Sequence, residues 1–295
     1  MGGKLLIAGG SLKKSKEKIH KLFIEYAGGI NSKIAIIPTA SGSDPKSTIK
    51  NVESLWIKLG INPKNIIELP IYGQEGKEWR QPALGDDDKI LDMLDGVTGF
   101  WFTGGNQYYT YKAFVRKDGS DTKILKELKN KYKLGGVIGG SSAGAAIMSE
   151  VMIASGESVT AINLPILYKY EDYDDRAGLR DVNVRLVKGL GFFKDGVIDQ
   201  HFDRRPRVLR LIRAVIDSKR DSYIGYGVSE DTAMIYDMDT KDITVVGSSA
   251  MYIIDCDNIK RPSEDDLRSF KDVILNIIRE GDKYNTIDNT ITFME

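Results

Sequence analysis

The chain has 295 residues, of which 41% are hydrophobic and 28% are charged. Its 42 Lys and Arg residues balance its 42 Asp and Glu residues, so no overall charge predicts binding to nucleic acid or to an anionic membrane. The lone Cys256 excludes an internal disulfide and suggests a reducing compartment. The first ten residues lack the apolar core of a signal peptide, and no apolar run is long enough to span a bilayer. We therefore expect a cytoplasmic protein made of one domain, residues 1–295.

The first two thirds of the chain alternate between short apolar runs and amphipathic segments. The apolar runs predict strands, and the segments between them predict helices. The expected strands are 4–8, 33–38, 65–69, 97–102, 135–139, 151–154 and 196–199, and the expected helices are 15–26, 45–59, 86–94 and 143–150. This order indicates right-handed βαβ crossovers and a mostly parallel sheet with helices on both faces. The predicted fold class is therefore α/β.

The remaining third predicts further strands and two helices. The expected elements are a helix that begins at Pro206, strands 223–228 and 232–236, an antiparallel pair 241–246 and 250–254, a closing helix 264–280 capped by Ser263, and a strand-like tail 284–293. The stretch 155–185 has weak periodicity and contains the acidic and aromatic run 168–176. Such a run is typical of a solvated loop, and the alternative is a lid whose carboxylates bind a cationic substrate group.

A serine in G-x-S-x-G spacing, Gly140-x-Ser142-x-Gly144, lies at an expected strand-to-helix turn. Small flanking residues allow a sharp turn that exposes the serine at the carboxyl edge of the sheet. The turn also places the amide of Ala143 beside the hydroxyl, where an oxyanion would form. The alternative is a Gly/Ser loop that only closes the connection. Ser142 is thus a candidate nucleophile.

Two histidines, His20 and His201, are the candidates for an imidazole base. His20 lies among lysines and a glutamate on an expected helix, so we expect it to be a solvated helix residue. His201 and Glu230 each follow an expected strand, as Ser142 does. A serine hydroxyl needs a base to take its proton, and the base needs a carboxylate to orient it. These three residues could therefore form a triad, although their spacing alone does not bring them together.

Two further groups of residues are expected at the same edge of the sheet. The glycine-rich turn 103–107 follows a strand, and it either closes that strand or presents amides to an oxyanion. Arg205 and Arg207 lie close to His201 in the chain, and Arg207, Arg210 and Arg213 share one face of the expected helix. These arginines either form a solvated helix face or bind a substrate in the crevice at the carboxyl ends of the strands.

Four ordered segments make the chain resemble the cyanophycinase family of serine peptidases, to which the aspartyl dipeptidase called peptidase E also belongs. They are F-T-G-G-N-Q over 102–107, G-G-S-S-A-G-A over 139–145, D-Q-H-F over 199–202 with its spaced arginines, and G-Y-G-V-S-E-D-T-A over 225–233. The third segment is the most specific, because it separates cyanophycinases from the shorter dipeptidase. The resemblance extends from the first strand to about Ile254, and the stretch 155–185 aligns with none of it.

The resemblance implies an α/β/α sandwich similar to class I glutamine amidotransferases, with the nucleophile on a strand–helix elbow. It implies Ser142 as nucleophile, His201 as base and Glu230 as the orienting acid. The oxyanion hole would consist of backbone amides of Gly105, Asn106 and Ala143. The residues implied to line the substrate pocket are Gln107, Asp199, Gln200, Arg205, Arg207 and Arg210.

The implied activity is that of a serine exopeptidase without metal or cofactor. The implied substrate is cyanophycin, a polyaspartate backbone with arginine on each side-chain carboxyl, or shorter peptides that contain β-Asp-Arg. The implied product is the β-Asp-Arg dipeptide. Arginines suit the substrate carboxylates as two-donor partners, and acidic groups suit the substrate guanidinium. The resemblance also suggests a homodimer.

Two positions depart from the family pattern, because Ser141 and Ser229 stand where threonine and aspartate are expected. Ser141 leaves open which serine attacks, and Ser229 changes the hydrogen bonding beside Glu230. The alternatives are a related aspartyl peptidase for short peptides and a non-catalytic binding protein on the same fold. A glutamine amidotransferase needs cysteine at the elbow, whereas Cys256 lies far along the chain. A dinucleotide site is disfavoured because the segment 9–11 lacks the G-x-G-x-x-G pattern.

Overall fold

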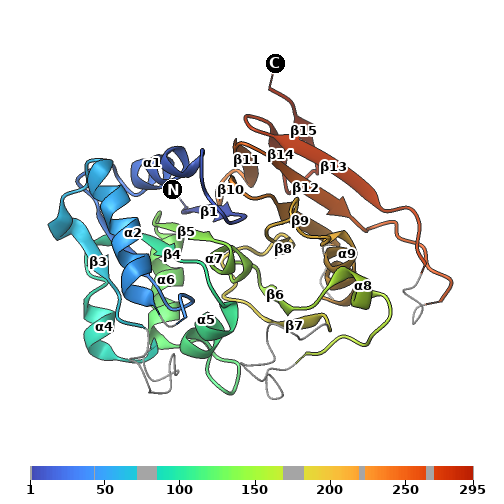
Figure 1. Ribbon diagram of the computed structural model, residues 1–295, viewed down its shortest axis with the longest axis horizontal. Helices are drawn as coiled ribbons and strands as arrows, with labels where there is room; N and C mark the ends of the chain where they lie inside the picture. The colour runs from blue at the N-terminus through green and yellow to red at the C-terminus, as the bar shows by residue number, and fades with distance from the viewer. Residues whose placement is uncertain are drawn as a thin grey trace.

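The computed structural model describes residues 2–42, 44–71, 85–168, 183–218, 223–263 and 269–294. Strands and helices alternate along the first part of the chain, and strands dominate its last part (Figure 1). Most of the acidic run 168–176 lies outside the described residues, as does the start of the expected helix 264–280. Within the ranges above, none of the helices combines the length and the hydropathy that a membrane crossing requires.

The larger sheet has the strand order β15-β14-β11-β10-β1-β5-β4-β2-β3. Its parallel half consists of β1 (Lys4–Ala8), β5 (Val137–Ser141), β4 (Val97–Phe102), β2 (Lys33–Ile37) and β3 (Ile66–Glu68). Its antiparallel half consists of β10 (Thr232–Asp237), β11 (Asp242–Gly247), β14 (Lys283–Asn285) and β15 (Ile291–Thr292). The expectation of a mostly parallel sheet is therefore correct for only one half of the larger sheet. In the other half, short connections join β10 to β11 and β14 to β15, and such connections produce antiparallel neighbours.

A second sheet has the order β13-β12-β9-β8. Its strands are β8 (Val197–Asp199), β9 (Ile224–Val228), β12 (Ala250–Asp255) and β13 (Ile274–Arg279). The strands β8 and β9 are parallel, and the other neighbours are antiparallel. A separate antiparallel pair consists of β6 (Val151–Ser155) and β7 (Arg185–Lys188).

The expected closing helix 264–280 is wrong over the residues that the structure describes. The strand β13 occupies Ile274–Arg279 and pairs with β12 along its whole length. The apolar residues of this segment recur in adjacent pairs, which imitates the pattern of a helix face. The segment is nevertheless rich in isoleucine, whose branched side chain favours a strand once a neighbouring strand is available.

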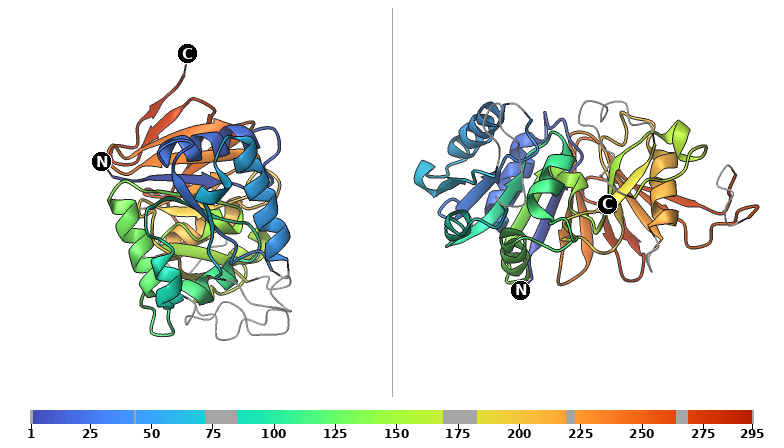
Figure 2. Two further views of the ribbon diagram at one scale, coloured as in Figure 1. Left: turned by 90° about the vertical axis from the view of Figure 1, so that its left-hand side faces the viewer. Right: turned by 90° about the horizontal axis from the view of Figure 1, so that it is seen from below.

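Helices lie on both faces of the parallel half (Figure 2). Along β1, Leu6 and Ala8 pack with α1 (Lys16–Tyr26) and α2 (Pro45–Lys58), whereas Leu5 and Ile7 belong to the core on the opposite face. That core also receives side chains from α4 (Asp88–Asp92), α5 (Gln107–Phe114), α6 (Lys123–Lys133) and the second sheet. The short helix η1 (Pro63–Asn65) precedes β3. The outer face of the second sheet is covered by α8 (Ser158–Ala161) and α9 (Val208–Asp217).

His20 is buried, so the expectation of a solvated residue is wrong. Only 2% of its surface is exposed, and its Nδ1 accepts a hydrogen bond of 3.0 Å from Nε1 of Trp56. The imidazole also lies 4.3 Å from Trp101, measured between ring centroids. The lysines next to His20 in the chain project outward, but His20 shares its helix face with Phe23 and Ile24, three and four residues later.

Candidate active site

Ser142 occupies the turn between β5 and the short helix α7 (Ala143–Ala146). Its backbone has φ 57° and ψ −111°, a conformation that residues other than glycine rarely adopt. Two glycines make the turn possible. A Cβ on Gly140 would lie 2.5 Å from the Gly144 carbonyl oxygen, and a Cβ on Gly144 would lie 2.3 Å from the Phe102 carbonyl oxygen. The G-x-S-x-G spacing therefore lets α7 approach β5 and β4 closely beneath the serine.

The side chains of Ser142, His201 and Glu230 form one hydrogen-bonded chain. Oγ of Ser142 lies 2.8 Å from Nε2 of His201, and Nδ1 of His201 lies 2.6 Å from Oε1 of Glu230. The hydroxyl that contacts the imidazole is that of Ser142. Ser141 is the preceding residue, the last of β5. His201 and Glu230 follow the parallel neighbours β8 and β9, whose carboxyl ends meet at one edge.

The loop after β1 holds the backbone beside His201 and Glu230 in place. The amide of His201 donates to the Gly9 carbonyl at 2.8 Å, and the amide of Asp231 donates to the Gly10 carbonyl at 2.9 Å. A Cβ on Gly10 would lie 2.4 Å from Cε1 of His201, so a side chain at position 10 would displace the imidazole. The glycines after the first strand therefore make room for the ring of His201.

Three residues around Glu230 were not predicted from the sequence. The Ser11 hydroxyl donates to the Glu230 carboxylate, and the Glu230 amide donates to Oδ1 of Asp203 at 2.8 Å. The Asp231 carboxylate accepts from the amides of Lys13 and Ser15 at 2.6 and 3.0 Å, which ties the loop after β1 to the carboxyl end of β9. Ser11 could have been found, because it follows a strand that neighbours β5. The contacts of the two aspartates join residues far apart in the chain and have no local pattern.

Burial and charge keep the imidazole of His201 neutral. Burial lowers the pKa of His201, the hydrogen bond to Glu230 opposes this effect, and the charges of Arg205 and Arg207 lower the pKa further. The hydrogen bond from His201 lowers the pKa of Glu230, partial burial opposes the effect, and the bond from Ser11 reinforces it. The result is a neutral base beside an ionised carboxylate, which is the charge state needed to accept a proton from Ser142.

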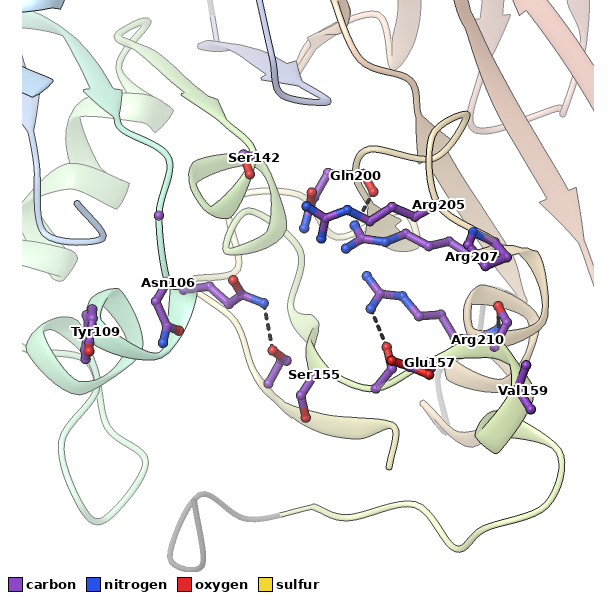
Figure 3. Close-up of a pocket in the computed structure, with 16 residues that line it drawn as sticks. Asn106, Tyr109, Ser142, Ser155, Glu157, Val159, Gln200, Arg205, Arg207 and Arg210 are labelled. Carbon is purple, nitrogen blue, oxygen red and sulfur yellow. Dashed lines mark hydrogen bonds between the residues drawn. The ribbon is translucent and has the colours of Figure 1, made fainter. Parts of the chain in front are cut away.

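A pocket of about 730 Å³ opens beside Ser142 (Figure 3). Its lining includes the expected residues Gly105, Asn106, Gln107, Gln200, Arg205, Arg207 and Arg210, together with the segment 154–159. Gln107 donates from Nε2 to the Ala154 carbonyl at 2.7 Å and thereby joins α5 to that segment. Oε1 of Gln200 is buried and has no hydrogen-bond donor among the residues that the structure describes. It is therefore an acceptor available to a ligand.

The turn before α5 lies close to the serine. A Cβ on Gly104 would lie 3.4 Å from Cβ of Ser142. The Asn106 amide donates to the Ala40 carbonyl at 2.8 Å, and the Asn106 side chain accepts from the amide of Tyr108 as the N-cap of α5. The amides of Gly105 and Ala143 have no acceptor within the described part of the chain. Of the three amides expected in an oxyanion hole, these two are available.

Asp199 binds two of the arginines instead of facing the pocket. Its side chain is 1% exposed and accepts from Nε and Nη2 of Arg210 at 2.7 and 2.6 Å, and from Nη1 of Arg207 at 3.2 Å. Burial alone would raise the pKa of Asp199, but the charges and hydrogen bonds of Arg210 and Arg207 lower it. Arg210 also donates to the Gly156 carbonyl at 2.6 Å. These arginines are not a solvated helix face, since both are 6% exposed.

Arg205 differs from these two arginines. It is exposed and lines the pocket, and its side chain forms no ion pair or hydrogen bond with a residue of the described ranges. In Figure 3 its side chain extends toward Ser142, and its charge lowers the pKa of His201. The structure therefore leaves Arg205 available to hold an anionic group of a ligand.

The hydroxyl of Ser229, which stands where the family pattern has aspartate, is fully buried. It has no hydrogen-bond partner in the part of the chain that is described. The side chains that hold Glu230 are thus those of Ser11 and His201. We find no structural account of the unpaired hydroxyl.

Comparison with known proteins identifies the family of the chain. A model of peptidase family S51 matches residues 5–244. The chain belongs to this family. Membership of this family makes the chain a peptidase of the serine type, and the matched residues include Ser142, His201 and Glu230.

Relatives of this S51 peptidase include three proteins named cyanophycinase. The one from Geminocystis herdmanii is 28% identical over 287 residues, which cover 95% of this chain and 92% of that protein. The one from Thermosynechococcus vestitus is 28% identical and matched over 95% and 78% of the two chains. The one from Trichormus variabilis is 25% identical and matched over 97% and 86%.

A solved structure shares the fold of the S51 peptidase. It is a peptidase from an acI-B1 Actinobacterium, with a TM-score of 0.62, 18% sequence identity and coverage of 97% of both chains. Identity at this level supports a common fold and no statement about the substrate.

Proposed function

We propose that this protein is a metal-independent serine exopeptidase that hydrolyses cyanophycin to β-Asp-Arg dipeptides. The observation that carries the proposal is the contact of Ser142 with His201 and of His201 with Glu230, at one end of a pocket that offers a free guanidinium. The relatives named cyanophycinase support the choice of substrate.

In the proposed reaction, Ser142 attacks the scissile carbonyl while Nε2 of His201 takes the hydroxyl proton. Glu230 stabilises the resulting imidazolium through its hydrogen bond to Nδ1. His201 then gives the proton to the leaving amine, and an acyl group stays on Ser142. Water, activated by His201, hydrolyses this ester and frees the serine. The strand–turn–helix around Ser142 serves as the nucleophile elbow of an α/β/α sandwich in this proposal.

Two backbone amides stabilise the negative charge that develops on the carbonyl oxygen. We assign this role to Gly105 and Ala143, whose amides have no acceptor among the described residues. Asn106 is left out of the assignment because its amide is bonded to the Ala40 carbonyl. Preorganised donors of this kind contribute about 3–4 kcal/mol each to transition-state stabilisation.

The pocket suits a substrate that has both carboxylates and hydrogen-bond donors. Arg205 holds a substrate carboxylate, and Oε1 of Gln200 accepts from a substrate N–H group. Arg207 and Arg210, neutralised in part by Asp199, support the wall and add positive charge. A neutral peptide would leave these groups without partners in a dehydrated site, which costs binding free energy.

The proposal is tested by incubating the purified protein with insoluble cyanophycin and identifying the soluble products by mass. We expect the β-Asp-Arg dipeptide, at a rate that EDTA does not change. No group of three or more His, Cys, Asp or Glu side chains is placed to hold a metal ion in the ranges that the structure covers. Release of aspartate from short peptides without attack on the polymer would instead identify a related aspartyl peptidase. Loss of activity in EDTA would contradict metal independence.

A further inference from the structure

One acidic side chain of the pocket has no place in the proposed reaction. Glu157 lines the pocket, is exposed, and occupies the N-cap position of α8 without capping it through its side chain. Its carboxylate forms no ion pair or hydrogen bond with a residue in the described ranges. Because the carboxylate is exposed and does not cap the helix through a hydrogen bond, it is available to a ligand.

The backbone around Glu157 is held firmly although its side chain is free. Arg210 donates from Nη1 to the Gly156 carbonyl at 2.6 Å, and the Arg210 amide donates to Oγ of Ser158 at 3.3 Å. Arg210 is itself fixed by two hydrogen bonds to the buried Asp199. The residues on each side of Glu157 are therefore attached to the same support as the base, since Asp199 ends the strand that leads to His201.

The positive and negative side chains of the pocket lie at different distances from Ser142. In Figure 3, Arg205, Arg207 and Arg210 lie between Ser142 and Glu157. The positive groups therefore lie nearer the serine than the free carboxylate does. A ligand of matching charge has its carboxylates near the scissile bond and a cation farther from it.

A second observation also indicates a ligand rich in hydrogen-bond donors. Gln200 lines the pocket and is 5% exposed, and its buried Oε1 has no donor from the described part of the chain. A buried polar atom of this kind normally has a partner. A ligand that only had carboxylates would satisfy neither Gln200 nor Glu157.

We propose that Glu157 binds the guanidinium of the substrate arginine and thereby selects arginine-bearing β-aspartyl linkages. This inference rests on the proposed function and deepens it. A guanidinium presents two parallel N–H groups to a carboxylate, whereas a neutral urea of the same shape pairs with it only weakly. Glu157 thus discriminates between a charged and a neutral side chain of the substrate, while Ser142 and His201 carry out the reaction.

The test compares two short β-aspartyl peptides that differ only in one group. One carries arginine on each aspartate, and the other carries citrulline, in which a neutral urea replaces the guanidinium. We expect the wild-type protein to prefer the arginine peptide by about ten- to a hundred-fold in kcat/KM, the effect of one charge-assisted pair. Glu157→Gln should bring this ratio close to one by slowing the arginine peptide, with little change for the citrulline peptide.

The matched control is Glu25→Gln, which removes an exposed carboxylate from α1, outside the pocket lining. It should keep the wild-type ratio, and all three proteins should have the same thermal midpoint. A wild-type ratio in Glu157→Gln would overturn the inference and leave the proposed function intact. If the wild-type protein cleaves neither peptide and releases nothing from cyanophycin, the proposed function fails, and the inference fails with it.

Discussion

The imidazole of His201 lies in an environment that disfavours its protonated form. Burial is the largest cause, and the nearby charges of Arg205 and Arg207 act in the same direction against the hydrogen bond to Glu230. Because the base must be neutral to take the Ser142 proton, activity should be present above the lowered pKa of His201. It should be lost as the pH falls through that pKa, below the ordinary value of about 6.5.

Removal of one positive charge should move this transition. In Arg205→Gln the pKa of His201 rises, since a cation that opposed protonation is gone, and the acid limb shifts to higher pH. The measurement is the pH dependence of the rate at which a small serine-directed phosphonate modifies the protein, because this reagent needs no carboxylate clamp. An acid limb that stays in place or moves to lower pH would contradict the assigned environment.

The arginines of the pocket should respond differently to substitution by lysine. Arg205→Lys loses two-pronged contact with a substrate carboxylate, so kcat/KM for cyanophycin should fall about ten- to a hundred-fold while the free energy of unfolding changes by less than about 0.5 kcal/mol. Arg210→Lys breaks the paired hydrogen bonds to the buried Asp199, so the free energy of unfolding should fall by about 1–3 kcal/mol. Urea unfolding and kinetics of both variants distinguish the roles. Equal loss of stability in the two variants would show that Arg205 also has a buried partner.

The meeting of Ser142, His201 and Glu230 could be predicted because each residue has a recognisable local sequence pattern. Ser142 has the G-x-S-x-G spacing, and His201 and Glu230 follow apolar strands whose ends meet at one edge of a sheet. The role of Asp199 could not be predicted in this way. A carboxylate next to arginines suits a substrate cation as well as it suits the arginines themselves, and only its burial, at 1% exposed, decides between them.

The helices α1 and α2 are joined by the buried pair His20 and Trp56. Burial, with a smaller contribution from Lys16, lowers the pKa of His20 to about 3. The imidazole therefore stays neutral in the folded protein at a pH where it is protonated in the unfolded chain. Its contribution to stability is present above the unfolded pKa of about 6.5 and is lost as the pH falls toward the folded value.

This linkage gives a test of the packing between the two helices. Between pH 7 and pH 5, His20 should reduce the free energy of unfolding by about 2 kcal/mol. His20→Gln should lower stability at pH 7 and should show a weaker loss over the same interval, because glutamine does not titrate. Urea unfolding of both proteins at the two pH values measures the difference. The same pH dependence in both would mean that His20 is accessible to protons in the folded state.

The elements were predicted well where local pattern and pairing agree. The strands β1, β2 and β4 lie within a residue of their expected bounds, because buried strands have continuous apolar runs bounded by polar turns. The helix expected over 143–150 ends at Ala146, and β6 begins at Val151. The small residues of this segment are compatible with a tight turn against β4 as well as with a longer helix. The length of the helix therefore depends on packing against β4, which the local sequence does not show.

The residues of the hydrogen-bonded chain come from both sheets of the molecule. Ser142 follows β5 of the larger sheet, whereas His201 and Glu230 follow β8 and β9 of the second. The chain passes from the second sheet back to the larger one at Glu230 and Asp231. One continuous core also receives side chains from both sheets. Neither sheet alone could hold the hydrogen-bonded chain.

A shared core predicts that the sheets unfold together. Circular dichroism and the rate of phosphonate modification should follow one transition with the same midpoint in urea. This result would also support the prediction of a single domain over residues 1–295. Loss of modification at a lower urea concentration than loss of secondary structure would show instead that the two sheets separate before they unfold.

The most direct test of the account compares cyanophycin hydrolysis by Ser142→Ala and Ser141→Ala. The contact at 2.8 Å between Ser142 and His201 assigns the attack to Ser142. We predict that Ser142→Ala loses release of β-Asp-Arg by about a million-fold, to the background rate, and that Ser141→Ala keeps much of the wild-type rate. An active Ser142→Ala protein, or an inactive but folded Ser141→Ala protein, would contradict the assignment of Ser142 as the nucleophile.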